Sequence, residues 1–231
     1  MAIQQHDFVE LDYTGRLTDG NQVFDTTLEE VAKKEGAYKE HAHYHPAVIC
    51  IGTAQIITGI DEFLLGKELG VHTVALTPDQ AFGKKNTKLL QLIPLARFKE
   101  QKIQPMPGLQ INIDGALGTV RTSSGGRVIV DFNHPLAGKN VTYELNVKRI
   151  LQDITEKVKM WLHQELHLDA EVQVSQGIVT ATSEHEIPPS IAVEITKKLA
   201  PILGIKSLEF RKSSQQNTTV ATPIVKETNL K

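Results

Sequence analysis

Cysteine is almost absent from this sequence, and the single example is Cys50 in the apolar run AVICIG. One thiol cannot form an internal disulfide, so the fold depends on hydrophobic burial rather than on cross-links. Apolar surroundings also disfavour the charged thiolate that a nucleophile needs. We therefore expect Cys50 to be a small core residue without a catalytic role.

Long apolar runs and an excess of charge of one sign are also missing. No run reaches the roughly 18 apolar residues of a membrane-spanning helix, and the start, MAIQQHDFVELDY, lacks the pattern of a signal peptide. The net charge is −2, the pI is about 6.5, and the basic residues are dispersed. Nothing here attracts nucleic acid or an acidic membrane. We expect a cytoplasmic protein with neither partner.

The motifs of cofactor and nucleophilic chemistry are absent as well. The sequence has no G-x-x-x-x-G-K-[ST] loop, no strand-G-x-G-x-x-G-helix unit, no H-E-x-x-H, no paired C-x-x-C and no G-x-S-x-G. The acidic pair Asp61 and Glu62 occupies neighbouring helical positions that point in different directions. We therefore expect no cofactor and no acid–base or nucleophilic step.

Histidine, in contrast, is concentrated in the stretch EHAHYHP, where His41, His43 and His45 alternate with other residues. In an extended chain these three side chains point to one side, which is a geometry that a divalent metal could use. No carboxylate or thiolate of this stretch points to the same side to complete a strong site. They remain weak metal candidates, and solvated loop histidines are the alternative.

The first part of the chain has the pattern of an antiparallel sheet with short helices. Two strand-like runs flank Asp19-Gly20, a tight-turn signal. TTLEEVAKKEG predicts a short helix with Thr26 or Thr27 as its N-cap, and QIITGIDEFLLG predicts a second one. The strands AVICIG and VHTVAL and the alternating run VTYELNV complete this pattern.

Two further regions follow different patterns. The interval of roughly 45 residues after Asn86 is too long for a structureless loop, and it predicts a small inserted β-rich domain with a hairpin at Gly125-Gly126. From residue 153 the pattern is helix, two strands around a glycine, helix and strand, with Trp161 favoured as a core residue. The polar segment 213–231 is expected to be a flexible tail.

Four segments occur in an order that resembles the FKBP family of peptidyl-prolyl cis/trans isomerases, namely YTGRLTDGNQVFDTT, IGTAQIITGIDEFLLG, PDQAFG and VTYELNV. The closer similarity is to the SlyD-like and long archaeal branch. In that branch an insert-in-flap domain follows the A-[YF]-G turn, and the chain rejoins at a segment like DFNHPLAGKNVTYELNV. The resemblance covers residues 5 to 152 and extends more loosely to the C-terminal region.

The resemblance implies an α+β fold: an FKBP half-barrel, in which an antiparallel sheet wraps on a short helix, with an inserted small β-rich domain and a C-terminal α/β domain. The implied boundaries are 1–86 plus 131–152 for the isomerase domain, 87–130 for the insert and 153–212 for the C-terminal domain. It also implies an apolar catalytic cleft formed by Tyr13, Phe24, Asp25, Ile56, Ile57, Ile60, Phe82, Leu136 and Tyr143.

The roles implied for this cleft involve no proton transfer. The backbone N–H at Ile57 corresponds to one that binds a substrate carbonyl, whereas Tyr13 and Asp25 shape the cleft through hydrogen bonds. Two departures from the family pattern concern affinity. Ile60 stands where many members have tryptophan, and Phe82 lacks the hydroxyl that a tyrosine would offer.

The implied substrates are unfolded or partly folded polypeptides with X–Pro bonds. The insert would hold such chains in a chaperone-like way. For the C-terminal domain the sequence leaves two roles open, formation of a homodimer and capture of substrate. Two other functions stay open: a non-catalytic chaperone or binding module, and a metal-handling protein that uses the histidine cluster. The apolar residues expected to bind substrate in the insert are Leu89, Leu90, Leu92, Ile93, Phe98 and Met106.

Overall fold

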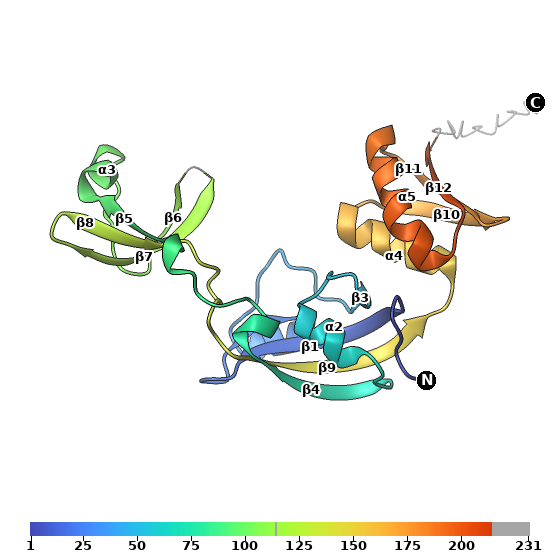
Figure 1. The fold of residues 1–231 in the computed structure, drawn as a ribbon, viewed down its shortest axis with the longest axis horizontal. Coiled ribbons are helices and arrows are strands. Elements are labelled where there is room, and N and C mark those ends of the chain that lie inside the picture. Colours follow the sequence, from blue (N-terminus) through green and yellow to red (C-terminus); the bar gives the residue numbers. More distant parts are fainter. Residues whose placement is uncertain (114, 214–231) are drawn as a thin grey trace, which may run out of the picture. The chain divides into compact units, whose positions relative to one another are not determined.

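The computed structural model describes residues 1–113 and 115–213. The chain divides into two compact units, Met1–Leu151 and a second one that begins at Gln152. Figure 1 shows the first unit from blue to yellow and the second from yellow to red. Each is described by itself below.

The first unit is built on an antiparallel sheet in the order β2-β1-β9-β4, with β3 paired to β1. The two longest strands, β1 and β9, form its centre and pair from Phe8↔Leu151 to Leu17↔Val141. Burial alternates along β9, which gives the sheet one covered face. The strands are β1 (Phe8–Leu17), β2 (Val23–Thr26), β3 (Ala47–Cys50), β4 (Gly70–Leu76) and β9 (Val141–Leu151).

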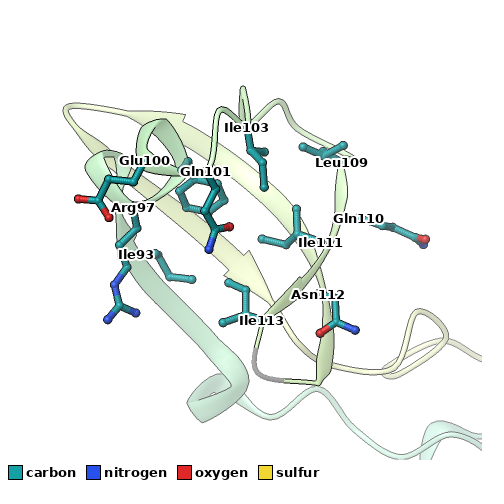
Figure 2. A pocket seen from close by; sticks show the side chains of 11 residues that line it. Ile93, Arg97, Glu100, Gln101, Ile103, Leu109, Gln110, Ile111, Asn112 and Ile113 are labelled. Atoms are coloured by element: carbon teal, nitrogen blue, oxygen red, sulfur yellow. The ribbon is translucent and has the colours of Figure 1, made fainter.

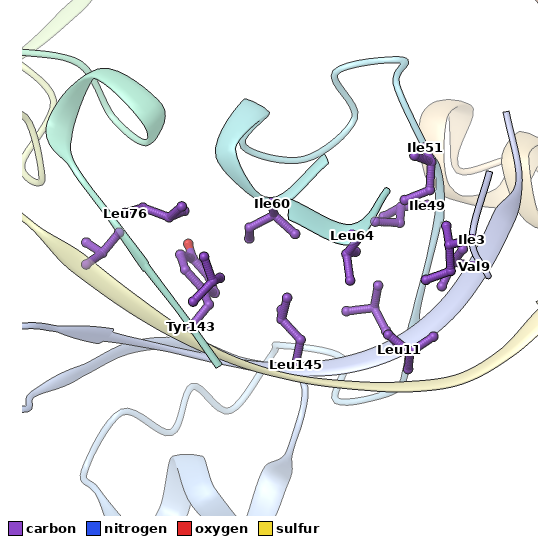
Figure 3. Packing of buried hydrophobic residues seen from close by; sticks show 13 residues of the cluster. Ile3, Val9, Leu11, Ile49, Ile51, Ile60, Leu64, Leu76, Tyr143 and Leu145 are labelled. Carbon is purple, nitrogen blue, oxygen red and sulfur yellow. The ribbon is translucent and has the colours of Figure 1, made fainter. Parts of the chain in front are cut away.

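The short helix α2 (Thr58–Leu64) covers this face of the sheet. Its residues Ile60 and Leu64 are fully buried, and Figure 3 shows them directed towards Leu145 and Leu11 of the sheet. Burial of such side chains stabilises a fold by roughly 1.5–3 kcal/mol each. The expected α+β fold, an antiparallel sheet wrapped on a short helix, is thereby confirmed, and Cys50 is buried as expected.

The other helix of this unit, α1 (Glu29–Lys34), begins differently from the prediction. Its N-cap is Leu28, without a side-chain cap, so the expectation of a threonine cap was wrong. Thr26 and Thr27 instead fasten β2 to β1: the Thr26 hydroxyl donates to the Tyr13 carbonyl, and the Tyr13 N–H donates to Thr27 Oγ1. The threonine hydroxyls that the local pattern assigned to the helix N-terminus thus form tertiary hydrogen bonds with β1 instead.

A second sheet occupies the region of the predicted insert, in the order β5-β8-β7-β6. It has its own core, with Val120, Val128 and Val130 fully buried. The hairpin between β7 and β8 turns at Gly125 and Gly126, as predicted, and both glycines have positive φ. Its elements are 3-10 turn η2 (Thr87–Leu89), β5 (Leu90–Pro94), β6 (Gln110–Ile113), β7 (Ala116–Ser124) and β8 (Arg127–Asp131).

This region also contains a helix that the sequence pattern did not predict, α3 (Leu95–Glu100). It follows Pro94 and is too short to display helical periodicity, and Phe98 alone among its residues is buried. The η1 turn (Pro78–Gln80) follows β4 and corresponds to the Pro-Asp turn that was expected.

The second unit has the predicted order of helix, two strands, helix and strand. Strand β10 pairs antiparallel with β11, and β12 pairs parallel with β11 after the crossover through α5. Trp161 is 9% exposed and lies in α4, so it is a core residue, as favoured. The elements are α4 (Ile154–Leu166), β10 (Ala170–Ser175), β11 (Ile178–Ser183), α5 (Pro189–Leu203) and β12 (Ser207–Lys212).

The expectation of a flexible tail over 213–231 concerns residues that lie, apart from Ser213, outside the described part of the chain. Within the described residues, none of the helices has both the length and the apolar character needed to cross a bilayer.

Candidate active site

Four aromatic rings from separate parts of the sequence meet at one end of the first sheet's core. Phe24 makes edge-to-face contacts with Phe82 and Tyr143, at centroid distances of 5.8 and 5.7 Å, and Tyr13 lies 6.1 Å from Tyr143. Gly15 permits this packing, because a Cβ there would lie 2.7 Å from the Phe24 ring and 2.9 Å from Tyr143. The YTG motif has glycine at this position because the rings of Phe24 and Tyr143 lie too close to the backbone for a side chain.

The tyrosine hydroxyl at the edge of this cluster is held by a carboxylate. Tyr13 Oη donates to Asp25 Oδ2 at 3.0 Å. Burial, followed by the charge and the hydrogen bond of Asp25, raises the pKa of Tyr13 far above its usual range. Tyr13 therefore stays protonated at neutral pH, in agreement with a structural role instead of proton transfer.

The start of α2 brings three isoleucines to the same cluster. Ile56 and Ile57 are half-buried against the core, and Ile60 is fully buried within it. The Ile57 carbonyl caps the helix by accepting from the N–H groups of Ile60 and Asp61. Among the described residues, no acceptor pairs with the Ile57 N–H. That donor is the backbone group able to bind a carbonyl of another chain.

The turn before α2 is held to the helix by hydrogen bonds to the side chain of Asp61. Its Oδ2 accepts from the Ala54 N–H at 3.2 Å, and Gly52 supplies a second backbone hydrogen bond. Asp61 is 5% exposed, and within the described residues its Oδ1 has no hydrogen-bond partner. Burial raises the pKa of this carboxyl, although the two backbone hydrogen bonds oppose the shift. One side chain thus links the turn to the helix that carries Ile57 and Ile60.

A cavity of about 140 Å³ lies beside the Tyr13–Asp25 pair. The loop after α1 supplies its opposite wall with Lys39, His43 and Tyr44. Only His43 of these three was considered from the sequence, and then as a metal candidate. The lining residues are Tyr13, Phe24, Asp25, Thr26, Thr27, Ala37, Lys39, Ala42, His43 and Tyr44.

The three histidines considered as weak metal candidates lie in the loop between α1 and β3. His41, His43 and His45 are all exposed, and the His45 ring pairs with the neighbouring Pro46 carbonyl. In the described residues, no group of three His, Cys, Asp or Glu side chains is placed to hold a metal ion. The segment is a loop and not a strand, so the alternation along the sequence does not by itself direct the three side chains to one point.

One further residue of the segment DFNHPLAG contacts the cluster. His134 stacks on the ring of Phe82, with 4.7 Å between centroids and 3° between planes, and its Nδ1 accepts from the Leu136 N–H. Leu136 itself is half-buried in this turn. Among the described residues, it is not part of the hydrophobic core that contains the aromatic cluster. His134 was missed from the sequence, although it belongs to a quoted motif.

The insert contains a second and larger cavity, of about 630 Å³, between α3 and β6. Figure 2 shows Ile103, Ile111 and Ile113 directed into it. Of the six apolar residues expected to bind substrate here, Ile93 and Phe98 are buried in the insert's core and also line this cavity. Leu89, Leu90, Leu92 and Met106 are exposed by 38, 43, 56 and 58%.

The two segments that enter and leave the insert are joined side by side. The Asn86 N–H donates to Asn133 Oδ1 at 2.8 Å, and Asn133 Nδ2 donates back to the Asn86 carbonyl at 3.0 Å. Next to them, buried Asp131 accepts two hydrogen bonds from Arg121. Burial raises the pKa of Asp131, but hydrogen bonds from Asn133 and Arg121 outweigh it and lower the pKa to about 2.

Comparison with known proteins places these features in one family. A family model described as "FKBP26, IF domain" matches residues 91–136. The chain is 32% identical over 149 residues to the short-type peptidyl-prolyl cis-trans isomerase of Methanocaldococcus jannaschii, a match that covers 64% of this chain and 94% of that relative.

Two bacterial relatives agree. The FKBP-type 16 kDa peptidyl-prolyl cis-trans isomerase of Escherichia coli K12 is 29% identical over 154 residues, which is 64% of this chain and 94% of the relative. The FKBP-type peptidyl-prolyl cis-trans isomerase SlyD of Aeromonas hydrophila is 28% identical over 162 residues, which is 68% of this chain and 69% of the relative. The fold, an antiparallel sheet wrapped on a short helix, agrees with these similarities. The chain therefore belongs to the FKBP-type peptidyl-prolyl cis-trans isomerases, in their SlyD-like branch.

Proposed function

We propose that this isomerase accelerates proline-limited protein folding, with its catalytic cleft at the aromatic cluster and a chaperone-like binding surface on the insert. The observation that carries the first part is the convergence of Tyr13, Phe24, Asp25, Phe82 and Tyr143 beside the free Ile57 N–H. Its substrates are unfolded or partly folded polypeptides that contain X–Pro bonds.

The reaction suits such a site because no covalent bond is broken. Rotation about an X–Pro amide crosses a barrier of roughly 20 kcal/mol, since the planar amide loses its resonance on twisting. Apolar walls disfavour the dipolar planar form relative to the twisted form, and they bind the prolyl ring by burial. The partly exposed rings of Phe24 and Phe82 supply these walls, whereas Tyr143 and Ile60 support them from within the core. The Ile57 N–H anchors a substrate carbonyl.

A proline-limited refolding assay tests the catalytic proposal. Asp25→Ala removes the acceptor of the Tyr13 hydroxyl, a charged hydrogen bond for which about 1.5 kcal/mol is typical. We expect kcat/KM to fall about tenfold. Asp19→Ala, which removes an exposed turn carboxylate, is the matched control and should leave the rate unchanged. Full activity of Asp25→Ala would contradict the assigned site. A wild-type chain without activity would favour the non-catalytic binding module.

We further propose three domains, with boundaries at 1–86 plus 131–152, 87–130 and 153–212. Support for the middle one comes from its separate sheet and separate hydrophobic core, and from the paired asparagines at its neck. The match to the insert-domain family model over 91–136 overlaps it.

The chaperone-like surface is supported by apolar groups that the insert leaves open. Leu90 and Leu92 point outward from β5, and Met106 is exposed in the segment before β6. The cavity between α3 and β6 adds an apolar lining, and β6 is an edge strand of its sheet. An edge strand next to an apolar cavity can pair with an extended peptide and take its side chains. A chain held there would be concentrated beside the cleft.

Deletion of the insert tests this second activity. Because Asn86 and Asn133 are in hydrogen-bond contact, a short Gly-Ser connection can replace residues 87–130 without moving the ends. We expect the shortened chain to keep its kcat/KM on a proline tetrapeptide and to lose most of its catalysis of protein refolding. An equal loss of both activities, in a variant whose circular dichroism shows that it has folded, would contradict the proposed role.

A further inference from the structure

The charge of this chain is distributed unevenly, with the insert basic and the remainder acidic. Residues 87–130 contain six lysines and arginines and two acidic residues, so that they carry +4 in a chain of net charge −2. The remaining residues therefore carry −6. The balanced overall charge conceals a local field that acts on any chain approaching the insert.

Most of the basic groups in the insert are not neutralised by neighbours. Arg121 is paired with Asp131. Among the described residues, no ion pair involves the exposed side chains of the other five, which are Lys88, Arg97, Lys99, Lys102 and Arg127. Unpaired surface cations are free to interact with a partner.

One of these cations, Arg97, lines the large cavity, and two others lie close to it in the sequence. Arg97 and Lys99 lie on α3, which forms one side of the cavity, and Lys102 follows directly after the helix. Figure 2 shows Arg97 and Glu100 extending outward from α3, whereas Ile103 and Ile111 lie on the inside. An apolar interior thus adjoins Arg97 and Glu100 in the cavity lining, and Lys99 and Lys102 lie next to these residues in the sequence.

We infer that this cavity selects apolar segments flanked by acidic residues in unfolded chains. The inference rests on the proposed chain-binding role of the insert and adds the chemistry of its preferred ligand. The apolar side chains of such a segment would occupy the space lined by Ile103, Ile111 and Ile113. Its flanking carboxylates would then meet Arg97, Lys99 and Lys102 outside the cavity.

A polypeptide fits these features better than a nucleic acid does. Proteins that hold single-stranded nucleic acid combine a basic groove with aromatic rings that are open for base stacking. The only aromatic residue in the lining is Phe98, which is 4% exposed and packed in the insert's core. Aliphatic side chains next to cations are suited to a chain of mixed apolar and acidic character.

The test measures binding of three proline-free fluorescent peptides to the full chain. All three share one apolar centre of leucine, valine and phenylalanine, and they carry three glutamates, three glutamines or three lysines on each side. Without proline they do not engage the isomerase reaction. We expect the acidic peptide to bind about tenfold more tightly than the neutral one at 50 mM salt and the basic one most weakly, with the differences shrinking at 0.5 M salt because exposed charges are screened.

A charge-reversed variant, Arg97→Glu/Lys99→Glu/Lys102→Glu, locates the effect. It should reverse the preference, so that the basic peptide binds most tightly. Lys34→Glu/Lys159→Glu/Lys198→Glu is the matched control, because it changes the net charge equally at exposed positions outside the insert. The control should keep the wild-type preference. Retained activity on a proline tetrapeptide verifies that both variants are folded.

The outcomes separate this inference from the function on which it rests. If all three peptides bind equally well to the wild-type chain, the insert binds chains but the selection by charge is overturned. If no peptide binds, the proposed chain-binding role fails and the selection fails with it, whereas the isomerase activity is unaffected. If a single-stranded oligonucleotide binds more tightly than the acidic peptide, the preference for polypeptide is overturned.

Discussion

Asp61 has two carboxylate oxygens in unequal surroundings at the base of the candidate site. One accepts backbone hydrogen bonds from the preceding turn, and the other is buried without a partner among the described residues. Buried polar atoms of this kind cost about 1–3 kcal/mol. Asp61 therefore stabilises the fold as a hydrogen-bond acceptor. Its negative charge destabilises the fold at neutral pH, because burial disfavours the charged form and raises the pKa of this carboxyl.

Substitution at this position should separate the two contributions. Asp61→Ala leaves the N–H groups of Gly52 and Ala54 without their acceptor, and we expect a loss of about 2 kcal/mol of unfolding free energy. Asp61→Asn keeps a carbonyl for those groups and removes the buried charge, so its effect should stay below about 1 kcal/mol. Urea titration measures both, with Glu62→Gln as an exposed neighbouring control. Equal destabilisation by Ala and Asn would show that the charge itself is required.

The residues of the candidate site were predictable from the sequence when they lie on strands or at the start of α2. Tyr13, Phe24, Asp25 and Tyr143 lie on paired strands, so a motif order is sufficient to bring them together. Lys39 and Tyr44 were not predictable, because they belong to a loop whose path depends on contacts such as the stacked rings of Tyr38 and Tyr44. The same holds for His134, whose position depends on stacking against Phe82.

At the scale of elements, the ends of β7 and β8 are joined to the neck of the insert through one buried carboxylate. Asp131 terminates β8 and receives hydrogen bonds from Arg121 and from Asn133, the residue that also pairs with Asn86. Lys85 approaches the same carboxylate at 3.8 Å. Loss of the negative charge would loosen the sheet end and the neck together.

This arrangement predicts a specific loss of stability in acid. The folded pKa of Asp131 is lowered to about 2 from 3.8, so its contribution is present above about pH 4 and disappears as the pH falls towards 2. The contribution amounts to at most about 2 kcal/mol. Unfolding free energies measured between pH 5 and pH 2 should fall more steeply for the wild type than for Asp131→Asn. Asp19→Asn, an exposed control, should follow the wild type, and parallel curves for all three proteins would refute the assignment.

Elements with a clear periodicity were predicted correctly, and those shaped by their neighbours were not. The alternation along β9 and the helix–strand order of the second unit follow from side-chain patterning. Helix α3 has six residues, fewer than two turns, and its existence depends on Phe98 packing into the core of the insert. Thr26 and Thr27 were mistaken for helix caps because local rules do not register the pairing of β2 with β1.

At the scale of the whole molecule, the boundary at residue 152 separates units with different connectivity. In the first unit, the strands of the insert come between β4 and β9 in the sequence, and β9 then pairs between β1 and β4 in the main sheet. The second unit is continuous, with exposed apolar side chains on α5, where Ile191 is 41% and Val193 is 52% exposed. Positions two apart on a helix point to different sides, so these two side chains do not form one patch. We propose that the second unit joins two copies of the chain, which is one of the two roles that the sequence left open for it.

Truncation after Leu151 should therefore alter assembly and leave catalysis intact. Analytical ultracentrifugation should find the full chain as a dimer and the truncated chain as a monomer, with equal kcat/KM per chain on a proline tetrapeptide. A truncated chain that remains dimeric would place the interface in the first unit.

The pairing of Phe8 with Leu151 also determines how the first unit would respond to mechanical force. These two residues lie at the same end of the central strand pair, and they are also the points at which the ends of the unit leave its sheet. Tension applied between Phe8 and Leu151 would break the β1–β9 hydrogen bonds one after another from that end, rather than all at once. The unit would yield at low force, and the insert would remain unloaded for as long as Asn86 and Asn133 hold its neck closed.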